Sequence, residues 1–569
     1  MKNFIDYFRA IPIDLQPYLR PFLYGLIGGS AAVAFQLGIK LLEWSLWTQP
    51  SQNTGKYFVL ISLAVISTTS LLAGLILTYV SREAAGSGIP QLKVAFWRDF
   101  GYLPFKVAVA KFFAGIITIG GGCSLGREGP TVHIAGALAS NMAGMFGVAK
   151  QGRRAALLSG AAAGLAAAFN TPLSAITFVM EEIVEDLNNT IFLAQTLVAS
   201  VTATFVTHVF IGRDPAFVIP PVSQLSWTLT LLVIPTAALA ALAGVAFQKG
   251  TLIWRDRIKK LGRIPPYLKP VIGALINWAL GISVFFWIAR LGVFGLGYQD
   301  LESILRGQVS AMQALILLVA KLAATTAVYA WGGAGGIFSP TLFFGAAAGL
   351  LISTVCTPIA HLSPSDQLAL AVAGMSACLG AVVRAPITSI LIVFEMTHQF
   401  AFVPLLMIGA IASQAVSRLF CPSNFYSDVI ERDGIELDRH IPPRSLATLH
   451  HRPISTLANF SPVFACSTNG QELEQLCAAY PYQQFPLVID GRLVGMLDRN
   501  AVLEGQNIEQ AKRPAETVNP DATIRDSVTK MINKSVSLLV VLSPVDETPI
   551  GIVTLHDILR LQSQLAEAL

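Results

Sequence analysis

Long apolar segments alternate in this chain with shorter ones that end at glycine or proline, and this pattern leaves few possible folds. Segments that could span a membrane lie at about 21–47, 57–80, 105–119, 191–211, 225–247, 268–293 and 311–330. Others, at 131–148, 155–169, 173–181 and 387–394, are shorter than the roughly 20 residues that a helix needs to cross the hydrocarbon core. Helices that end inside a membrane are tolerated only where they are buried in protein or line a cavity. We therefore expect an all-α polytopic membrane protein with broken helices.

Composition excludes several other classes. Of the 569 residues, 53% are hydrophobic and only 13% are charged, whereas soluble domains carry about 25% charged residues. The net charge of +5 is dispersed, without the blocks of like charge that mark a nucleic-acid partner. The six cysteines have no framework or metal-ligand spacing, so we expect neither disulfides nor a metal site.

The stretch from Gly120 to Pro130 is the strongest candidate for a functional site. It places Arg127 and Glu128 between apolar segments, and ionisable groups at membrane depth mark ion or proton paths by default. Pro130 suits the first turn of a helix, whose unpaired N–H groups and positive dipole end favour an anion. The alternative is a glycine-rich packing turn with a structural Arg–Glu pair.

An internal duplication points to the same region. The sequence from Gly160 to Glu181 resembles that from Gly374 to Glu395, and the matching prolines Pro172 and Pro386 are 214 residues apart. Pro130 and Pro340 lie 210 residues apart in a second, similar pair. Interrupted segments in corresponding places of two halves indicate a transport site at their interface. Chance similarity between alanine-rich helices is the alternative.

The segments suggest a domain plan. The basic stretch 249–269 should face the cytoplasm by the positive-inside rule. A soluble tail repeats one small α/β unit, with Gly495 and Gly551 in equivalent places 56 residues apart. The expected parts are an N-terminal cytoplasmic amphipathic segment (1–20), a membrane domain (21–426) with two repeats (roughly 21–210 and 225–426), a linker (427–448), and a tail (449–569) in two copies (roughly 449–508 and 513–569).

Three motifs identify a family resemblance. Gly86–Pro90, Gly126–Pro130 and Gly336–Pro340 resemble, in order and spacing, the signature motifs of the CLC chloride channels and transporters. The tail resembles a tandem pair of CBS domains. The resemblance implies the CLC inverted-repeat fold and a homodimer with one anion path in each subunit. It also implies a multi-pass protein of a bacterial-type inner membrane, with the CBS pair in the cytoplasm.

The resemblance also implies site residues. Chloride would be bound by hydroxyl and backbone groups of a set drawn from all three motifs and the end of the membrane domain: Ser87, Gly126, Arg127, Gly129, Ile337, Phe338 and Tyr426. Glu128 would be the gating glutamate and outer proton carrier, and Glu182 the inner proton glutamate. Channels of the family generally lack an acid at the latter place. The expected function is therefore chloride/proton antiport, with a passive gated chloride channel as the alternative.

Other positions are weaker candidates. Lys93 stands where some transporting relatives carry an acid, which puts their local charge network in doubt here. Arg384 and Glu395 are expected to be structural, and His133 is expected to be packed or hydrogen-bonded.

In the tail, Thr554 and Asp557 resemble the CBS pattern that holds a nucleotide ribose. The first copy has Asp498 and Ala501 in those places, so at most one site would bind an adenine nucleotide. The alternative is a purely structural, dimerising pair, and no cofactor is required for transport.

Two other classes of membrane protein fit the sequence less well. An intramembrane metalloprotease would need an HExxH helix to hold zinc, and no histidine here is followed by that pattern. A CBS-bearing cation transporter should line its pore with several carboxylates, whereas few acids occur in the apolar segments. A chloride and proton transporter that is not an enzyme and has no nucleic-acid partner fits the sequence better.

Overall fold

The computed structural model describes residues 15–53, 57–148, 150–187, 189–220, 222, 225–262, 264–437 and 452–560. The chain divides into two compact units, residues 1–440 and 441–569. Most of the expected N-terminal segment, and the part of the expected linker from 438 on, lie outside the described residues.

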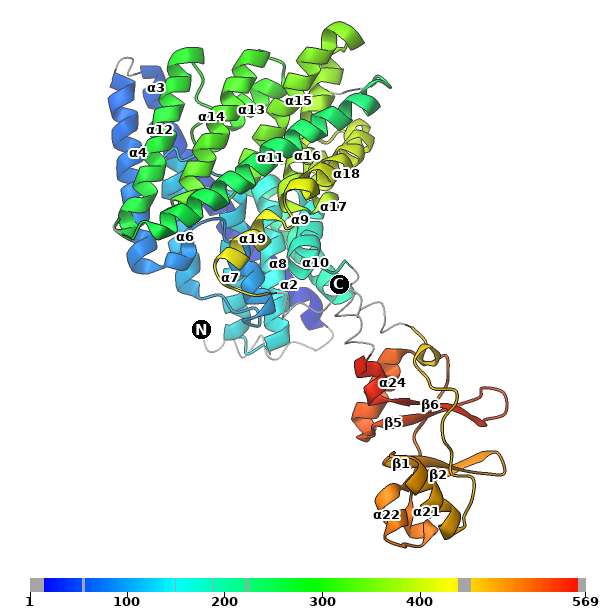
Figure 1. The fold of residues 1–569 in the computed structure, drawn as a ribbon. Coiled ribbons are helices and arrows are strands. Elements are labelled where there is room, and N and C mark those ends of the chain that lie inside the picture. Colours follow the sequence, from blue (N-terminus) through cyan, green and yellow to red (C-terminus); the bar gives the residue numbers. More distant parts are fainter. Residues whose placement is uncertain are drawn as a thin grey trace. The chain divides into compact units, whose positions relative to one another are not determined.

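The described part of the first unit is helical (Figure 1). Nine of its helical runs are long and apolar enough to cross a membrane. The helices of the first half are α2 (Gln16–Glu43), α3 (Gln49–Asn53), α4 (Phe58–Leu75), α5 (Ile89–Trp97), α6 (Phe105–Gly120), α7 (Glu128–Met145), α8 (Lys150–Phe169), α9 (Pro172–Phe178), its π-helical continuation η6 (Val179–Val184), and α10 (Thr190–Phe210). Those of the second half are α11 (Leu229–Lys260), α12 (Lys269–Ile288), α13 (Tyr298–Leu305), α14 (Ala311–Ala330), α15 (Phe338–Ala360), α16 (Pro364–Val383), α17 (Pro386–Thr397), α18 (Val403–Phe420) and α19 (Phe425–Arg432).

The two halves repeat one helix order with near-constant spacing. Helices α7 and α15 begin 210 residues apart, and the pairs α8/α16 and α9/α17 each begin 214 residues apart. The carboxylate of Glu181 accepts hydrogen bonds from the first backbone N–H groups of α17, while Glu395 on α17 does the same for α9. Each helix thus ends where the other begins. The two copies are antiparallel, which is the inverted relation expected of a CLC fold.

Glycines let paired helices approach closely within each half. Helix α7 packs along α8, and α15 packs along α16. A methyl group at Gly345 on α15 would overlap the carbonyl of Gly374 on α16, and one at Gly164 on α8 would meet the Thr131 carbonyl of α7 at 2.6 Å. Small residues at helix crossings allow such packing in membranes, where apolar burial drives association weakly. These close crossings fix the positions at which α7 and α15 begin.

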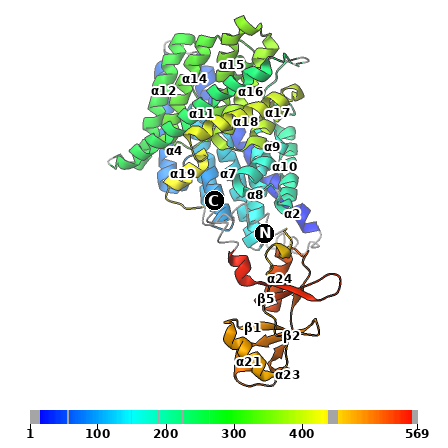
Figure 2. The same ribbon diagram turned by 45° about the vertical axis from the view of Figure 1, so that its right-hand side comes forward.

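Helix α19 is tied to the basic end of α11. The Asp433 carboxylate accepts hydrogen bonds of 2.8 Å from both Arg255 and Lys259, and Arg432 pairs with Asp256. Figures 1 and 2 show α19 beside the lower half of α11. This contact places α19 beside the basic end of α11.

The second unit holds two small sheets with helices on them. The strands are β1 (Gln484–Ile489), β2 (Arg492–Asp498) and β3 (Lys512–Arg513) in one sheet, and β4 (Thr517–Val518), β5 (Leu538–Leu542) and β6 (Pro549–Thr554) in the other. The helices are α21 (Gly470–Ala479), α22 (Arg499–Leu503), α23 (Ile508–Ala511) and α24 (Ile524–Lys534). Each copy has an antiparallel hairpin followed by a short helix, as the sequence predicted.

One segment at the start of the tail joins the second copy. Residues 452–459 fall within the bounds expected for the first copy, yet Pro453 pairs with Thr523 and Asn459 pairs with Ile552, both in the second copy. Ile454 is fully buried in the core of that second copy. The first copy's own core begins further on, and includes Ala465.

Candidate functional site

The three glycine motifs meet through backbone hydrogen bonds. Gly126 and Gly336 form an antiparallel bridge, in which each N–H donates to the carbonyl of the other at 2.7 and 2.6 Å. The Gly86 N–H donates to Gly333, and its carbonyl accepts from Gly335. Segments that are 40 to 250 residues apart in the sequence therefore build one site at the contact between the two halves.

Glu128 lies at the centre of this site as the first residue of α7, and its side chain is fully buried. Its Oε1 accepts hydrogen bonds from Tyr298 Oη at 2.7 Å and from Ser339 Oγ at 2.6 Å. The Arg127 Nε lies 3.9 Å from the same oxygen. A carboxylate can accept several such bonds when it is ionised, so this environment suits a charged Glu128.

Three buried oxygens near the motifs have no hydrogen-bond partner among the described residues: Ser87 Oγ, Tyr426 Oη and Glu128 Oε2. The Ser87 and Tyr426 side chains are at most 1% exposed. A methyl group at Gly129 would collide with Ser87 Oγ. Unsatisfied buried polar groups are rare and call for a ligand or water. The Ser87 and Tyr426 hydroxyls are therefore available to donate to an anion.

The other expected chloride ligands differ in what they offer. Phe338 begins α15 after Ile337, and the first N–H groups of a helix have no acceptor within it. The Gly126 N–H already donates to the bridge, although its Cα lies so close to Glu128 Oε2 that a methyl group would approach it to 2.5 Å. The Arg127 guanidinium donates to the Ala168 carbonyl at 3.0 Å.

A second buried carboxylate, Glu182 on η6, has a different set of partners. Its Oε1 lies 3.2 Å from the Lys93 ammonium, and its Oε2 accepts a hydrogen bond of 2.9 Å from Asn424, the residue that caps α19. The same ammonium lies 2.8 Å from Glu185. Lys93 and Glu182 are each about 2% exposed. Lys93, which stands where some transporting relatives were expected to carry an acid, therefore forms a network of one cation between two carboxylates.

Comparisons with known proteins identify the first unit. The sequence profile described as "voltage gated chloride channel" matches residues 69–418, which is more than half of the chain. The chain belongs to the CLC family. It is 31% identical over 417 residues to the H(+)/Cl(-) exchange transporter ClcA of Vibrio cholerae, covering 72% of this chain and 88% of the relative. ClcA of Vibrio parahaemolyticus is 30% identical over 427 residues, with the same coverage.

Solved structures show the same fold. The crystal structure of a slow cyanobacterial Cl⁻/H⁺ antiporter aligns with a TM-score of 0.66 at 24% identity, covering 74% of this chain and 98% of that one. A eukaryotic CLC transporter aligns with a TM-score of 0.64 at 20% identity, covering 95% of this chain and 98% of that one. A CBS-domain profile matches residues 508–564 in the second unit. The expected CLC fold with a C-terminal CBS region is confirmed.

The sequence did not reveal every residue of this CLC site. Tyr298 and Ser339 were not expected to contact Glu128, and Asn424 was not expected to contact Glu182. A signal for Tyr298 did exist, because it lies 210 residues after Gly88, the same offset that separates Pro130 from Pro340. The contacts of Asn424 depend on how α19 folds back, which no sequence pattern indicated.

The positions expected to be structural bond to backbone in the structure. Arg384 donates to the carbonyls of Cys421 and Pro422, and Glu395 caps α9. His133 is fully buried beside Gly88, and neither ring nitrogen has a partner among the described residues. It is packed, as expected, but not hydrogen-bonded.

In the CBS region, Thr554 and Asp557 bond to each other. Asp557 Oδ2 accepts from the Thr554 N–H at 2.8 Å and from the Thr554 hydroxyl at 2.7 Å. In the first copy, Asp498 accepts from the Asn500 N–H and caps α22. Asp498 thus caps α22, and Asp557 holds the turn that follows β6.

Proposed function

We propose that this chain is a secondary active transporter that exchanges chloride for protons, with Glu128 as the gate and outer proton glutamate and Glu182 as the inner proton glutamate. The observation that carries the proposal is that Glu128 Oε2 and the hydroxyls of Ser87 and Tyr426 are all buried without a hydrogen-bond partner among the described residues. A carboxylate and an anion would compete for those donors. Relatives named as exchange transporters support the coupling to protons.

The donors available to chloride are all uncharged. They are the Ser87 and Tyr426 hydroxyls and the first N–H groups of α15, from Ile337 and Phe338. An ion must bind well enough to enter the site and weakly enough to leave it. Uncharged donors achieve this better than direct contact with a positively charged lysine or arginine side chain. Gly129 contributes by letting α7 approach Ser87 closely.

The two glutamates are suited to opposite sides of the membrane. Glu182 bonds to the residue that caps α19, whose eight residues span about 12 Å to the basic end of α11. By the positive-inside rule that end is cytoplasmic. Tyr298, which bonds to Glu128, lines a pocket together with Phe285 and Ile288 at the far end of α12, about 30 Å from the Lys269 end. Glu128 would therefore exchange protons with the outside, and Glu182 with the cytoplasm.

The assembly is proposed from the same family. Helices α9, α10, α17 and α18 contact one another along one side of the unit (Figure 2). Exposed apolar side chains such as Ile191, Phe205 and Ile411 lie on them. We assign this face to a homodimer contact in a bacterial-type inner membrane. The CBS pair is assigned to the cytoplasm, with one adenine-nucleotide site at Thr554 and Asp557.

The test is uphill transport in liposomes. With the purified protein reconstituted, an imposed chloride gradient should drive protons against their own gradient. Glu182→Gln should abolish proton flux and spare part of the chloride flux, whereas Glu128→Gln should leave chloride flux that no longer drives protons. Glu302→Gln, an exposed change on α13, should behave as wild type. Chloride flux without proton movement in the wild type would instead identify a passive channel. Intact coupling in Glu182→Gln would remove that residue from the mechanism.

A further inference from the structure

The contacts of Glu128 form a closed triangle of three oxygens. Tyr298 Oη and Ser339 Oγ each lie within 2.7 Å of Glu128 Oε1, and they are 2.8 Å from each other. A hydroxyl has one hydrogen to donate. Both hydroxyls can therefore donate to Oε1 at the same time, and these bonds are strongest while Glu128 is ionised. A proton on Glu128 weakens both bonds and so favours release of the side chain.

Three helix starts deliver these side chains to one point. Glu128 is the first residue of α7, Tyr298 is the first of α13, and Ser339 is the second of α15. The start of a helix carries partial positive charge, which favours a negative group beside it. The arrangement thus concentrates stabilising groups on the charged, bound position of the Glu128 side chain.

The internal repeat gives Tyr298 a counterpart in the first half. Lys111 and Lys321 lie 210 residues apart, and both are fully buried. Lys111 donates to the Ala85 and Gly86 carbonyls just before Ser87, while Lys321 donates to carbonyls of the loop just before Tyr298. In each half, therefore, a buried lysine supports the segment just before a residue that carries a hydroxyl. The Ser87 hydroxyl has no hydrogen-bond partner among the described residues, whereas the Tyr298 hydroxyl bonds to Glu128.

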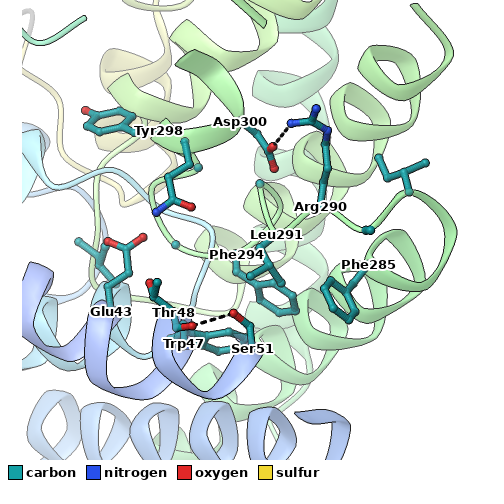
Figure 3. A pocket seen from close by; sticks show the side chains of 18 of the residues that line it. Glu43, Trp47, Thr48, Ser51, Phe285, Arg290, Leu291, Phe294, Tyr298 and Asp300 are labelled. Carbon is teal, nitrogen blue, oxygen red and sulfur yellow. Dashed lines mark hydrogen bonds and ion pairs between the residues drawn. The ribbon is translucent and has the colours of Figure 1, made fainter. Parts of the chain in front are cut away.

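Tyr298, which bonds to Glu128, also lines a pocket of about 430 Å³ (Figure 3). Glu43 also lines this pocket, and so do Asp300 and Arg290, which form an ion pair at 2.7 Å. The Arg127 guanidinium lies 5.4 Å from the centre of the Tyr298 ring. Tyr298 therefore contacts both this pocket and Glu128.

We propose that Tyr298 and Ser339 act as an outer latch, which holds the ionised Glu128 in its closed position and sets how readily a proton releases it. Both are positioning residues that act through Glu128, so the inference rests on the proposed role of Glu128 as the gate. The other charged or titratable groups that face the latch are Arg127, Tyr426 on α19, Lys321 on α14, and Glu43 and Asp300 in the pocket. None of these donates a hydrogen bond to Glu128 among the described residues, so the two hydroxyls are the contacts to remove.

The test measures chloride flux in liposomes with equal pH on both sides, from pH 4 to 8. Tyr298→Phe and Ser339→Ala each remove one hydroxyl donor and little volume. Each should raise flux at pH 7 several-fold and move the pH of half-maximal flux upward by about one unit, as expected for a lost bond to a charged group. Tyr79→Phe and Ser283→Ala remove exposed hydroxyls elsewhere and should match wild type.

The same changes in a Glu128→Gln background separate the two proposals. If Glu128 is the gate, Glu128→Gln should give flux with little pH dependence, and adding Tyr298→Phe should change neither flux nor profile. Wild-type pH dependence in Glu128→Gln would overturn the gate and the latch together. The latch alone would be overturned if Glu128→Gln removed the pH dependence as proposed while Tyr298→Phe and Ser339→Ala both kept the wild-type flux and the wild-type pH of half-maximal flux. The latch would also be overturned if Tyr298→Phe still raised the pH of half-maximal flux in the Glu128→Gln background. If one single variant fails to fold, the other decides.

Discussion

Glu181 and Glu395, which are 214 residues apart, cap each other's helices. Glu181 accepts from the N–H groups of Ile387 and Thr388 on α17, and Glu395 accepts from those of Leu173 and Ser174 on α9, at 2.7 to 3.2 Å. The accepting glutamates are 214 residues apart, and so are the corresponding donor residues on α9 and α17. One ancestral contact, made twice, holds the two inverted halves together beside the ion site.

These reciprocal caps should stabilise the helical unit. Glu181→Ala and Glu395→Ala each leave two helix N–H groups without an acceptor, and loss of a cap costs about 0.5–2 kcal/mol. Each variant should therefore melt at a lower temperature in detergent. Because the caps share one helix contact, the double variant should depart from additivity by about 0.5 kcal/mol or more. Glu302→Ala, which removes only an exposed pair with Arg306, is the control. Melting at the control's temperature in both single variants would contradict a capping role.

Sequence reasoning predicted the repeat, the broken helices and the motifs because each has a local signal. Pro172 and Pro386 mark helix starts, and Glu128 is a charged residue within an apolar context. The family resemblance implied an inverted second half, but the residues alone did not, because a repeated sequence folds with the same local rules in either orientation. The mutual caps of Glu181 and Glu395 are the contacts that reveal it.

The contacts of the site were less predictable than its residues. Glu128 was singled out from its surroundings in the sequence, but its partner Tyr298, the first residue of α13, lies 170 residues away and outside the three motifs. Lys93 was expected only to disturb a charge network known from relatives. Its actual role depends on Glu185, which a left-handed backbone conformation at φ 57° turns toward the ammonium. Such long-range placements follow from tertiary packing rather than from local pattern.

Close helix crossings should be sensitive to a single methyl group. Gly345→Ala places its Cβ against the Gly374 carbonyl, so α15 and α16 must separate. Overpacking of this kind costs about 1–3 kcal/mol. The variant should unfold at a lower temperature and lose chloride flux, because α15 carries Phe338 and Ser339 at its start. Gly250→Ala on α11, where the nearest atom would be 3.5 Å away, should remain at or above wild-type stability. Equal melting temperatures for the two variants would show that the crossing can relax.

The buried cation between Glu182 and Glu185 should make stability depend on pH when it is removed. Lys93→Met leaves two neighbouring carboxylates without their cation, and breaking a buried pair costs about 3–5 kcal/mol. Binding a proton relieves that cost, so the variant should be least stable near pH 8 and recover toward pH 5. Melting curves across this range measure the effect, with the exposed Lys106→Met as control. Adding Glu182→Gln should restore much of the stability at pH 8. A double variant as unstable as Lys93→Met alone would contradict the electrostatic explanation.

The contact between α19 and α11 should weaken in acid through Asp433. Burial raises the pKa of the Asp433 carboxyl, but hydrogen bonds and charges from Arg255 and Lys259 outweigh burial and hold the pKa below its usual value. A carboxyl that is more acidic in the folded state stabilises it fully above the unfolded pKa of about 3.9, and this contribution is lost as the pH falls through the folded pKa. Because the groups are partly exposed, Asp433→Asn should lower the free energy of unfolding by at most about 1 kcal/mol at pH 7. The difference from wild type should narrow below pH 4, as followed by denaturant melts at pH 7 and pH 3. Asp99→Asn, whose partner is its exposed neighbour Arg98, serves as control. A difference that stayed constant between the two pH values would assign the effect of Asp433→Asn to packing rather than to charge.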